Sequence, residues 1–308
     1  MADEAAFASR PWYARGKRGD VPARPRPAAS PMMAPSLPVV TFVSLEATIG
    51  AGKSTQLAML KEKFADKDDV VFLDEPDAEW EEHGLIHALY SGELDRCAFQ
   101  MIALTSRITD LLNLVLSGAR FIVSERSPLS DYLVFANSNL DGIDLCGYEY
   151  CFRKLQALLE KHAVFNVHMI CLDVKLETAI ARIAARGRHG EKNEQNECGI
   201  PEEYLRLLQA AHVEMIDLAT TNTLAQHCRD KPDPKNPRLT TRCTVLDGED
   251  GTDAINLRIQ LVVMQELMLH HTAAAAAAEA LLSDESPKSV IAGARRPEPV
   301  LHALSVQP

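Results

Sequence analysis

The sequence lacks the marks of several classes of protein. No apolar run among its 308 residues approaches the ~20 residues that span a bilayer, so we expect no membrane-spanning segment. Its seven cysteines form no CxxC pair, which speaks against a zinc site, and their odd number favours reduced thiols in an intracellular protein. An excess of basic residues is also missing: the formal net charge of −11 argues against a general nucleic-acid-binding protein.

The two ends of the chain have the composition of unfolded tails. Residues 1–38 are rich in Pro, Ala and Arg, which is typical of a disordered tail or of an organelle-targeting segment. Asp3 and Glu4 favour a plain tail, so we expect a cytoplasmic protein, with a mitochondrial location as the alternative. Residues 271–308 begin with alanines that can extend a helix, and we expect disorder after them. The sequence therefore predicts one working domain over residues 39–270.

Short apolar runs alternate with helical patterns along this domain. The apolar runs are residues 39–43, 70–73, 120–123, 167–172 and 243–246. Apolar residues recur at helical spacing over residues 55–64, 94–116, 150–161, 176–185, 202–218 and 253–269. Solidly apolar strands separated by helices indicate an α/β protein with a doubly wound parallel sheet of about five strands, covered by helices on both faces.

A phosphate-binding loop follows the first strand, where residues 47–55 read ATIGAGKST. Glycines let backbone N–H groups surround phosphate oxygens at the start of a helix, while Lys53 can reach the β- and γ-phosphates and Ser54 can bind Mg²⁺. Ala47 stands where the motif expects glycine, and it fits only at negative φ or at a cost of roughly 1 kcal/mol. The residues predicted to bind a nucleoside triphosphate are Ile49, Gly50, Ala51, Gly52, Lys53, Ser54 and Thr55.

Charged residues follow the other strands as well. Glu75 comes after the second strand, Glu125 and Arg126 end the third, and Asp247 ends the last. Parallel sheets bind ligands at the carboxyl ends of their strands, so we expect these side chains to converge. Glu75 is a candidate general base, Arg126 could neutralise a transferred phosphoryl group, and Glu125 or Ser54 could hold a metal ion.

Two helical patterns present polar residues on one face. Gln100 and Arg107 are seven residues apart, and Gln100 suits the edge of a nucleobase, although a solvated stripe is an equally good interpretation. Arg182 and Arg186 are four residues apart, and Arg188 follows a glycine. This arginine row is typical of a mobile lid over phosphates, or alternatively of a solvated helix end.

Together these motifs resemble the deoxynucleoside kinase family, which includes deoxycytidine, deoxyguanosine and mitochondrial thymidine kinases. The similarity covers about residues 39–270. The motifs that carry it, in chain order, are the phosphate loop, Glu75-Pro76, Trp80, Tyr90, Phe99-Gln100, Arg107, the ERSPLSD run at 125–131, Phe135, the lid arginines and GIPEEYL at 199–205. The resemblance implies a P-loop kinase fold with an Arg-rich lid, dependence on ATP and Mg²⁺, and transfer of the γ-phosphate to the 5′-hydroxyl of a deoxynucleoside, usually by a homodimer.

The resemblance also implies a role for each matching residue. The implied catalytic residues are Glu75 as base, Arg126, Lys53 and Arg186. The donor would be held by the phosphate loop together with Arg182, Arg186, Arg188 and Asp247, and Mg²⁺ by Ser54 and Glu125. The implied substrate-binding residues are Glu75, Trp80, Tyr90, Phe99, Gln100, Arg107, Arg126, Asp131, Phe135 and Glu197.

The pairing of Arg107 with Asp131 resembles deoxycytidine- and deoxypurine-preferring members, and it predicts that thymidine is disfavoured. The alternative is an ion pair that braces two elements. The chain departs from the family pattern at Ala47 and Thr48, which replace Gly-Asn, and the stretch from Tyr90 to Gln100 is one residue shorter. The lid also carries an insertion, so Glu191 or Glu194 could take the role of Glu197.

Two other functions fit parts of the sequence. A nucleoside monophosphate kinase would share the fold and the lid, but Glu75 would repel the phosphate of its substrate. A kinase-like structural subunit of mitochondrial respiratory complex I would not need the site, yet Lys53, Glu75, Arg126 and Arg186 are all in place. We therefore expect a deoxynucleoside kinase.

Overall fold

The computed structural model of the protein describes residues 37–186, 200–221, 223–224, 228 and 238–284. Most of the two predicted tails, namely residues 1–36 and 285–308, lies outside these residues. In the described part of the chain every helix falls short, in length or in apolar character, of what crossing a membrane requires.

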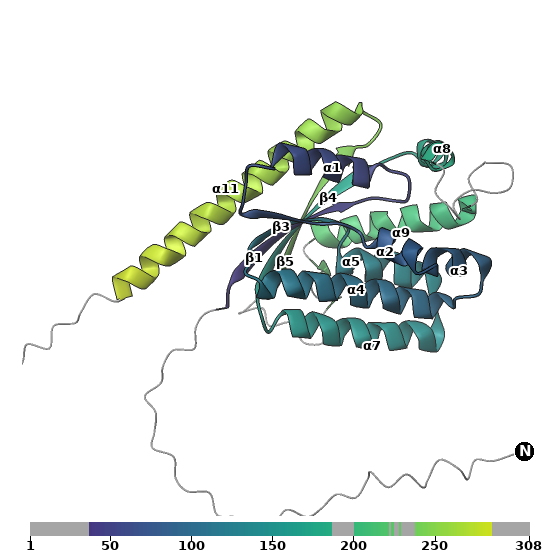
Figure 1. The fold of residues 1–308 in the computed structure, drawn as a ribbon, viewed down its shortest axis with the longest axis horizontal. Coiled ribbons are helices and arrows are strands. Elements are labelled where there is room, and N and C mark those ends of the chain that lie inside the picture. Colours follow the sequence, from purple (N-terminus) through teal and green to yellow (C-terminus); the bar gives the residue numbers. More distant parts are fainter. Residues whose placement is uncertain (1–36, 187–199, 222, 225–227, 229–237, 285–308) are drawn as a thin grey trace, which may run out of the picture. The chain divides into compact units, whose positions relative to one another are not determined.

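Five parallel strands form one sheet (Figure 1). They are β1 (Val39–Glu46), β2 (Val70–Leu73), β3 (Phe121–Glu125), β4 (Val164–Asp173) and β5 (Leu239–Asp247). Their order across the sheet is β2-β3-β1-β4-β5, so the chain leaves β1 toward one edge and later returns to build the other edge. The doubly wound parallel sheet predicted from the apolar runs is confirmed.

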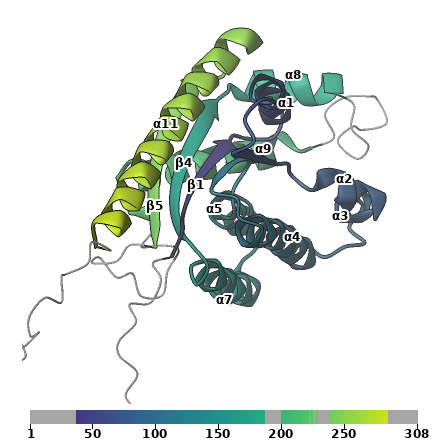
Figure 2. The ribbon, with the colours of Figure 1, turned by 60° about the vertical axis from the view of Figure 1, so that its left-hand side comes forward.

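The sheet is buried on both faces because helices cover each of them (Figure 2). Successive residues of β1 alternate between two cores: Val40 and Phe42 belong to one, and Val43 and Leu45 to the other. The first core is closed by α4 (Arg96–Leu116), α7 (Gly142–Leu159) and α9 (Glu202–Thr220). The second core is closed by α1 (Lys53–Lys63) and α11 (Thr252–Asp284).

Several short helices were not expected from the sequence. They are α2 (Asp77–Glu82), α3 (Leu85–Ser91), α5 (Pro128–Ser130), a π-helical turn η2 (Asp131–Ala136) and α6 (Asn137–Asn139). These segments are too short to show a helical period, so their apolar residues cannot reveal them. The helix α8 (Leu176–Arg186) agrees closely with the prediction, and it packs with Ile200 and Leu205 in a third, smaller core.

Some predicted boundaries were wrong. α7 begins at Gly142, eight residues before the predicted start, because Gly142 and Gly147 lower the helix propensity of its first turns. β5 begins at Leu239, since Thr240, Thr241 and Arg242 interrupt its apolar pattern. α11 continues through the alanine run to Asp284, as expected for the residue with the highest helix propensity.

Candidate active site

The phosphate loop connects β1 to α1 and contains two glycines in the left-handed region. Gly50 has φ 80° and Gly52, the residue that caps α1, has φ 97°. Ala47 keeps a negative φ, since Arg126 is the sole non-glycine residue with positive φ in the described part of the chain. Ala47 therefore meets the condition stated above, a negative φ, and replaces the glycine of the motif without backbone strain.

Lys53 lies buried at the first position of α1. Its Nζ donates to the carbonyl oxygens of Ala47 at 3.3 Å and Thr48 at 3.1 Å. Burial, and then the neighbouring Arg126, lower the pKa of Lys53 to about 8, although Glu125 and Glu75 act in the opposite direction. The ammonium is still mainly protonated at pH 7, and it lies where the loop would hold phosphates.

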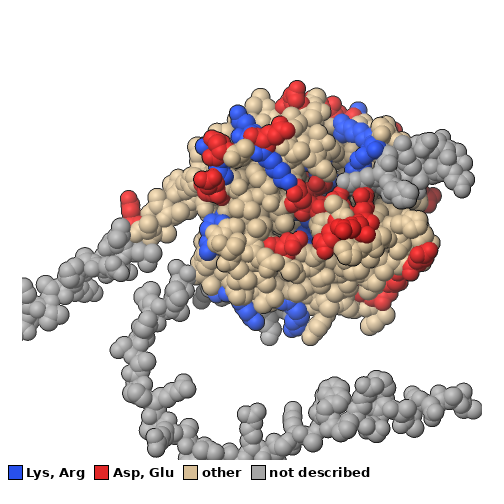
Figure 3. Space-filling model, viewed as in Figure 1, with Lys and Arg blue, Asp and Glu red and all other residues tan. Residues whose placement is uncertain are grey.

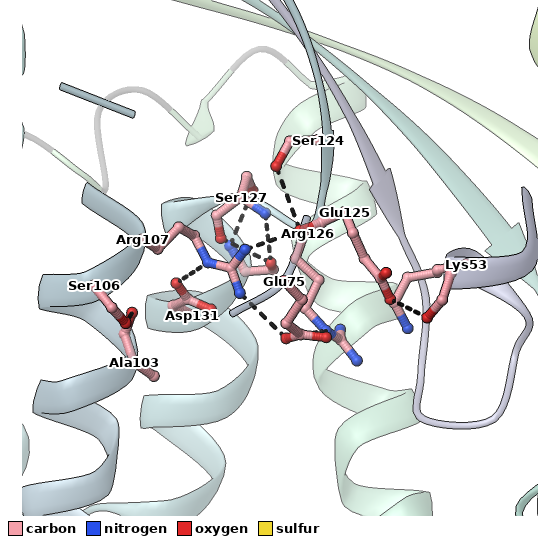
Figure 4. Close-up of polar contacts among 12 residues, drawn as sticks. Lys53, Glu75, Ala103, Ser106, Arg107, Ser124, Glu125, Arg126, Ser127 and Asp131 are labelled. Carbon is pink, nitrogen blue, oxygen red and sulfur yellow. Dashed lines mark hydrogen bonds and ion pairs between the residues drawn. The ribbon is translucent and has the colours of Figure 1, made fainter. Parts of the chain in front are cut away.

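Glu75 lies between two arginines (Figure 4). The Nε of Arg126 is 3.1 Å from Glu75 Oε1, and the Nη2 of Arg107 is 3.2 Å from the same oxygen. Glu75 follows β2 and Arg126 follows β3, and these strands are neighbours in the sheet. Burial raises the pKa of Glu75, but Arg126, Arg107 and Lys53 together lower it to about 2, so the carboxylate is ionised.

Arg126 adopts a backbone conformation that is uncommon for a residue with a side chain. Its φ is 66°, its N–H donates to Leu45 O at 3.0 Å, and its Nη1 donates to Ala47 O at 2.9 Å. Its guanidinium also stacks 4.5 Å above the ring of Phe135. Strained backbone held by several contacts is characteristic of functional sites, because the surrounding structure must stabilise it.

Arg107 and Asp131 form a buried ion pair behind Glu75. Arg107 Nε is 2.6 Å from Asp131 Oδ2, and Arg107 Nη1 donates to Glu125 O at 2.8 Å. Burial raises the pKa of Asp131 to about 6, although the attraction of Arg107 acts in the opposite direction. Since this pKa is still below neutral pH, the carboxyl group is mainly ionised there. Because Arg107 belongs to α4 and Asp131 to η2, the ion pair braces these two elements against each other. Neither side chain lines the cleft described below.

Ser54 and Glu125 lie side by side at the start of α1 and the end of β3. The hydroxyl of Ser54 donates to Glu125 Oε1 at 2.9 Å. A hydroxyl and a carboxylate are oxygen ligands of the kind that Mg²⁺ prefers, so the donor set fits this ion.

A cleft of about 600 Å³ opens beside the phosphate loop, which is within the usual size for a small-molecule site. The predicted site residues that line it are Ile49, Gly50, Ala51, Gly52, Lys53, Ser54, Thr55, Glu75, Trp80, Tyr90, Phe99, Gln100, Glu125, Arg126, Phe135, Arg182 and Arg186. Residues that the sequence did not assign also line it: Asp77, Glu81, Ile86, Leu89, Asn139, Tyr204 and Thr252. Figure 3 shows acidic side chains gathered over α2, which carries Asp77 and Glu81.

The structure separates some of the predicted residues from this cleft. Arg107, Asp131 and Asp247 are not part of its lining. Arg188 and Glu197 lie outside the described residues, as do the alternatives Glu191 and Glu194.

Among the unassigned residues, Asn139 donates to the hydroxyl of Tyr204 at 2.9 Å and so joins α6 to α9 at the edge of the cleft. Tyr204 belongs to the quoted GIPEEYL motif, which was the signal for its position. Asn139 follows a π-helical turn that no sequence pattern announced.

The lid helix α8 brings Arg182 close to two loops. Its Nη1 donates to Ala51 O of the phosphate loop at 3.2 Å, and its Nη2 donates to Gly248 O after β5 at 3.3 Å. Arg186, one turn further along the same helix, lines the cleft. The two arginines therefore border the phosphate loop, as a role in triphosphate binding requires.

Comparison with one solved structure supports the fold. The chain is similar to deoxyadenosine kinase from M. mycoides with products dCMP and a flexible dCDP bound, at 23% identity and a TM-score of 0.53, covering 73% of this chain and 99% of that one. A second structure of deoxyadenosine kinase from M. mycoides, with dATP bound, has 22% identity, the same coverage and a TM-score of 0.49. No curated protein matched the chain.

The model of the deoxynucleoside kinase family matches residues 43–249, a span that runs from β1 through the phosphate loop and the lid helix to the loop after β5. Within that span lie the charged strand ends described above. The chain therefore belongs to the deoxynucleoside kinase family and is an ATP-dependent nucleoside kinase, as its motifs predicted.

Proposed function

We propose that this enzyme transfers the γ-phosphate of ATP to the 5′-hydroxyl of a deoxynucleoside, with Glu75 as the general base. The observation that carries the proposal is the position of Glu75: its carboxylate lies in the cleft, fixed by Arg126, and the same cleft is lined by Lys53 of the phosphate loop. A carboxylate so held can accept the hydroxyl proton while the oxygen attacks phosphorus.

A pKa of about 2 makes Glu75 a weak base while Arg126 and Arg107 neutralise it. Triphosphate oxygens would compete for the guanidinium of Arg126, which is a strong ligand for phosphate. Once Arg126 turns toward phosphate, Glu75 keeps a weaker cationic partner and its affinity for a proton rises. Binding of the donor would thus prepare the base, and this coupling favours chemistry only when both substrates are present.

Phosphoryl transfer depends mainly on positioning and on the stabilisation of negative charge. Four cationic side chains line the cleft near the phosphate loop, and together they would stabilise the negative charge of the transferred group: Lys53, Arg126, Arg182 and Arg186. Ser54 and Glu125 would hold Mg²⁺, which neutralises phosphate oxygens when it is bound.

The nucleoside would lie at the other end of the cleft. Gln100 is buried and lines it, and its amide can both donate to and accept from a base edge. Trp80 and Phe99 meet edge to face with their centroids 5.4 Å apart. Phe135, whose ring lies beneath the guanidinium of Arg126, lines the same cleft. With Tyr90 near the sugar, these residues would bind a deoxynucleoside and exclude water.

We assign the preference for deoxycytidine or deoxypurines over thymidine to Arg107 and Asp131. The pair lies just behind the lining of the cleft, and Arg107 orients the Asp131 carboxylate, which could accept from an exocyclic amino group that reaches past the lining. Thymine has no exocyclic amino group to donate there, so it would leave buried polar atoms unpaired.

An ATP-consumption assay across the four deoxynucleosides tests the proposal. We expect turnover with deoxycytidine, deoxyadenosine or deoxyguanosine that exceeds turnover with thymidine. Turnover confined to nucleoside monophosphates would identify a monophosphate kinase instead, and the absence of both turnover and ATP binding would favour a structural subunit.

We also propose that the enzyme is a homodimer joined through the outer face of α7. Ile143 and Tyr150 on α7 are 83% and 64% exposed, and Leu116 of the neighbouring α4 is 60% exposed. Sedimentation of the wild type and of an Ile143→Asp/Tyr150→Asp variant tests this: the variant should sediment as a monomer.

For the compartment we propose the cytoplasm, with the mitochondrion as the alternative. The six cysteines that the structure describes are free thiols, which suits a reducing compartment. Fractionation of cells with detection of the intact chain distinguishes the two locations.

A further inference from the structure

The helix that carries the lid arginines begins without a capping residue of its own. Helices usually begin at Ser, Thr, Asp or Asn, whose side-chain oxygen accepts from a backbone N–H of the first turn. The residues before α8 are Val174 and Lys175, and neither side chain can accept a hydrogen bond. A side-chain acceptor for this end of the helix therefore has to come from another element.

Glu249, in the loop between β5 and α11, supplies that acceptor. Its Oε1 accepts from the backbone N–H of Lys175 at 2.9 Å, and its Oε2 accepts from the hydroxyl of Thr178 at 2.8 Å. The N–H of Lys175 and then the Thr178 hydroxyl lower the pKa of Glu249, so it is a carboxylate at neutral pH. A negative charge is also favoured at the N-terminal end of a helix.

The same loop holds α8 a second time, two turns further along. Arg182 Nη2 donates to Gly248 O at 3.3 Å, and Lys175, Thr178 and Arg182 share one helical face because their spacings are three and four. Gly248 itself donates to Asp173 O at 2.7 Å and leaves no room for a side chain, since a Cβ there would collide with Val174. The loop is thus packed against the beginning of α8.

Another face of α8 rests on the phosphate loop. A Cβ on Gly50 would lie 2.6 Å from Ala179 O and 2.8 Å from Ile183 Cγ1, so the loop and the helix are in direct contact. α8 is therefore clamped between the phosphate loop and the β5–α11 loop. Both loops belong to the donor side of the cleft, where Thr252 at the start of α11 also lines the wall.

We infer that Glu249 is a positioning residue for the phosphate donor: it joins the β5–α11 loop to the first turn of α8 and so holds Arg182 and Arg186 over the phosphate loop. This inference rests on the proposed function, in which the two arginines bind the triphosphate. Glu249 does not line the cleft, so it acts through α8 rather than on ATP. Gln100 and Phe135 come from other elements, so binding of the deoxynucleoside should not depend on it.

The experiment compares full-length variants in steady-state kinetics. Loss of a capping interaction at the first turn predicts that Glu249→Ala raises the KM for ATP about fivefold to tenfold. The KM for the deoxynucleoside should stay within about twofold of the wild-type value, because its binding residues are untouched. Glu249→Gln keeps an acceptor oxygen and should recover most of the affinity for ATP.

Asp250→Ala is the matched control, because it removes the neighbouring carboxylate. That carboxylate pairs with Arg258 of α11 at 2.6 Å, whereas the carboxylate of Glu249 contacts α8. Its KM values should equal those of the wild type. Equal KM values for ATP in Glu249→Ala and the wild type would overturn the inference, and so would a parallel rise of both KM values.

Hydrogen exchange separates this inference from the proposed function. Without nucleotide, the amides at the first turn of α8 should exchange faster in Glu249→Ala than in the wild type or in Asp250→Ala. If the wild type phosphorylates no deoxynucleoside, the proposed function fails, while this comparison still decides whether Glu249 holds the helix. Unchanged exchange in Glu249→Ala would refute the link itself.

Discussion

Arg126 Nε lies 3.1 Å from Glu75 Oε1, so the ends of two adjacent parallel strands are joined by an ion pair. Arg107 from α4 adds a second cation to the same carboxylate oxygen. The carboxylate is thus held in place by two buried guanidinium groups before any substrate binds. Such preorganisation is what a reaction that depends on positioning requires.

Glu75→Gln should remove the base while it keeps the shape of the side chain. We expect kcat to fall by about 10²–10⁴-fold, the usual contribution of a general base, with a small change in KM. Steady-state kinetics provide the measurement, and Glu79→Gln on the exposed side of α2 is the control that should retain full activity. A Glu75→Gln enzyme that keeps more than about a tenth of the wild-type kcat would rule out this role.

The pKa of Lys53 predicts an alkaline limit for donor binding. The ammonium loses its proton above a pKa of about 8, and with the proton it loses its attraction for phosphate. The KM for ATP should therefore rise as the pH increases beyond about 8, by at most about tenfold per pH unit. Lys53→Arg carries a permanent charge and should show no such rise, whatever its affinity at pH 7. A wild-type KM that stays constant up to pH 9.5 would contradict the prediction.

Arg107→Met combined with Asp131→Ala should relax the choice of base. We expect the ratio of kcat/KM for thymidine to that for deoxycytidine to rise at least about tenfold, because the site no longer presents buried polar groups that thymine leaves unpaired. Either single variant should lose about 3–5 kcal/mol of unfolding free energy, since it leaves one buried charge without its partner.

The exposed pair formed by Arg206 and Glu202 on α9 is the matched control. Its double variant, Arg206→Met with Glu202→Ala, should change the unfolding free energy by less than about 1 kcal/mol and leave the thymidine ratio unchanged. If the buried double variant keeps the wild-type ratio, Arg107 and Asp131 serve only to brace two elements.

Gly50 and Gly52 differ in what surrounds them, so their alanine variants should differ in stability. Both have positive φ, but a Cβ on Gly52 meets nothing within 4 Å, whereas a Cβ on Gly50 meets the backbone of α8. We expect Gly52→Ala to cost about 1–2 kcal/mol from backbone strain alone. Gly50→Ala should cost roughly 2–5 kcal/mol, since displacement of α8 adds to the same strain. Denaturant unfolding without nucleotide measures both, and equal losses would show that α8 does not press on the loop.

His212 predicts how stability responds to acid. Burial, and then Arg126, lower its pKa to about 3, and its Nε2 has no hydrogen-bond partner among the residues that the structure describes. Because the folded-state pKa lies below the unfolded value, its stabilising contribution is complete above about pH 6.5 and is lost as the pH falls toward 3. The unfolding free energy of the wild type should therefore fall more steeply than that of His212→Leu, by at most about 1.4 kcal/mol per pH unit. The exposed His83→Leu should follow the wild-type curve. Identical slopes for wild type and His212→Leu would show that the buried imidazole is not responsible.

Local patterns in the sequence predicted much of the site. The apolar runs identified all five strands, and the rule that parallel strands bind ligands at their carboxyl ends selected Glu75, Glu125 and Arg126. The phosphate loop was recognised from residue types and spacing alone. The strands were predicted correctly because a strand, a turn or a helix start depends on residues close together in the chain.

Contacts between distant segments could not be predicted in the same way. Helical spacing suggested Arg107, but its distances to Asp131 and Glu75 depend on how α4 packs against the sheet and η2. The positive φ of Arg126 has no sequence signal, because arginine has no preference for that conformation. Glu249 carries no local sequence signal, because its partners Lys175 and Thr178 lie more than 70 residues earlier in the chain.

By itself the sequence determined a five-stranded α/β fold, a phosphate-loop motif and the charged residues at the strand ends, since period and residue type are local properties. Only the tertiary structure decided which charges meet, which residues lie behind the cleft rather than in it, and which loop caps the lid helix. Those relationships depend on packing that brings residues far apart in the chain to within a few ångströms, and no local pattern records it.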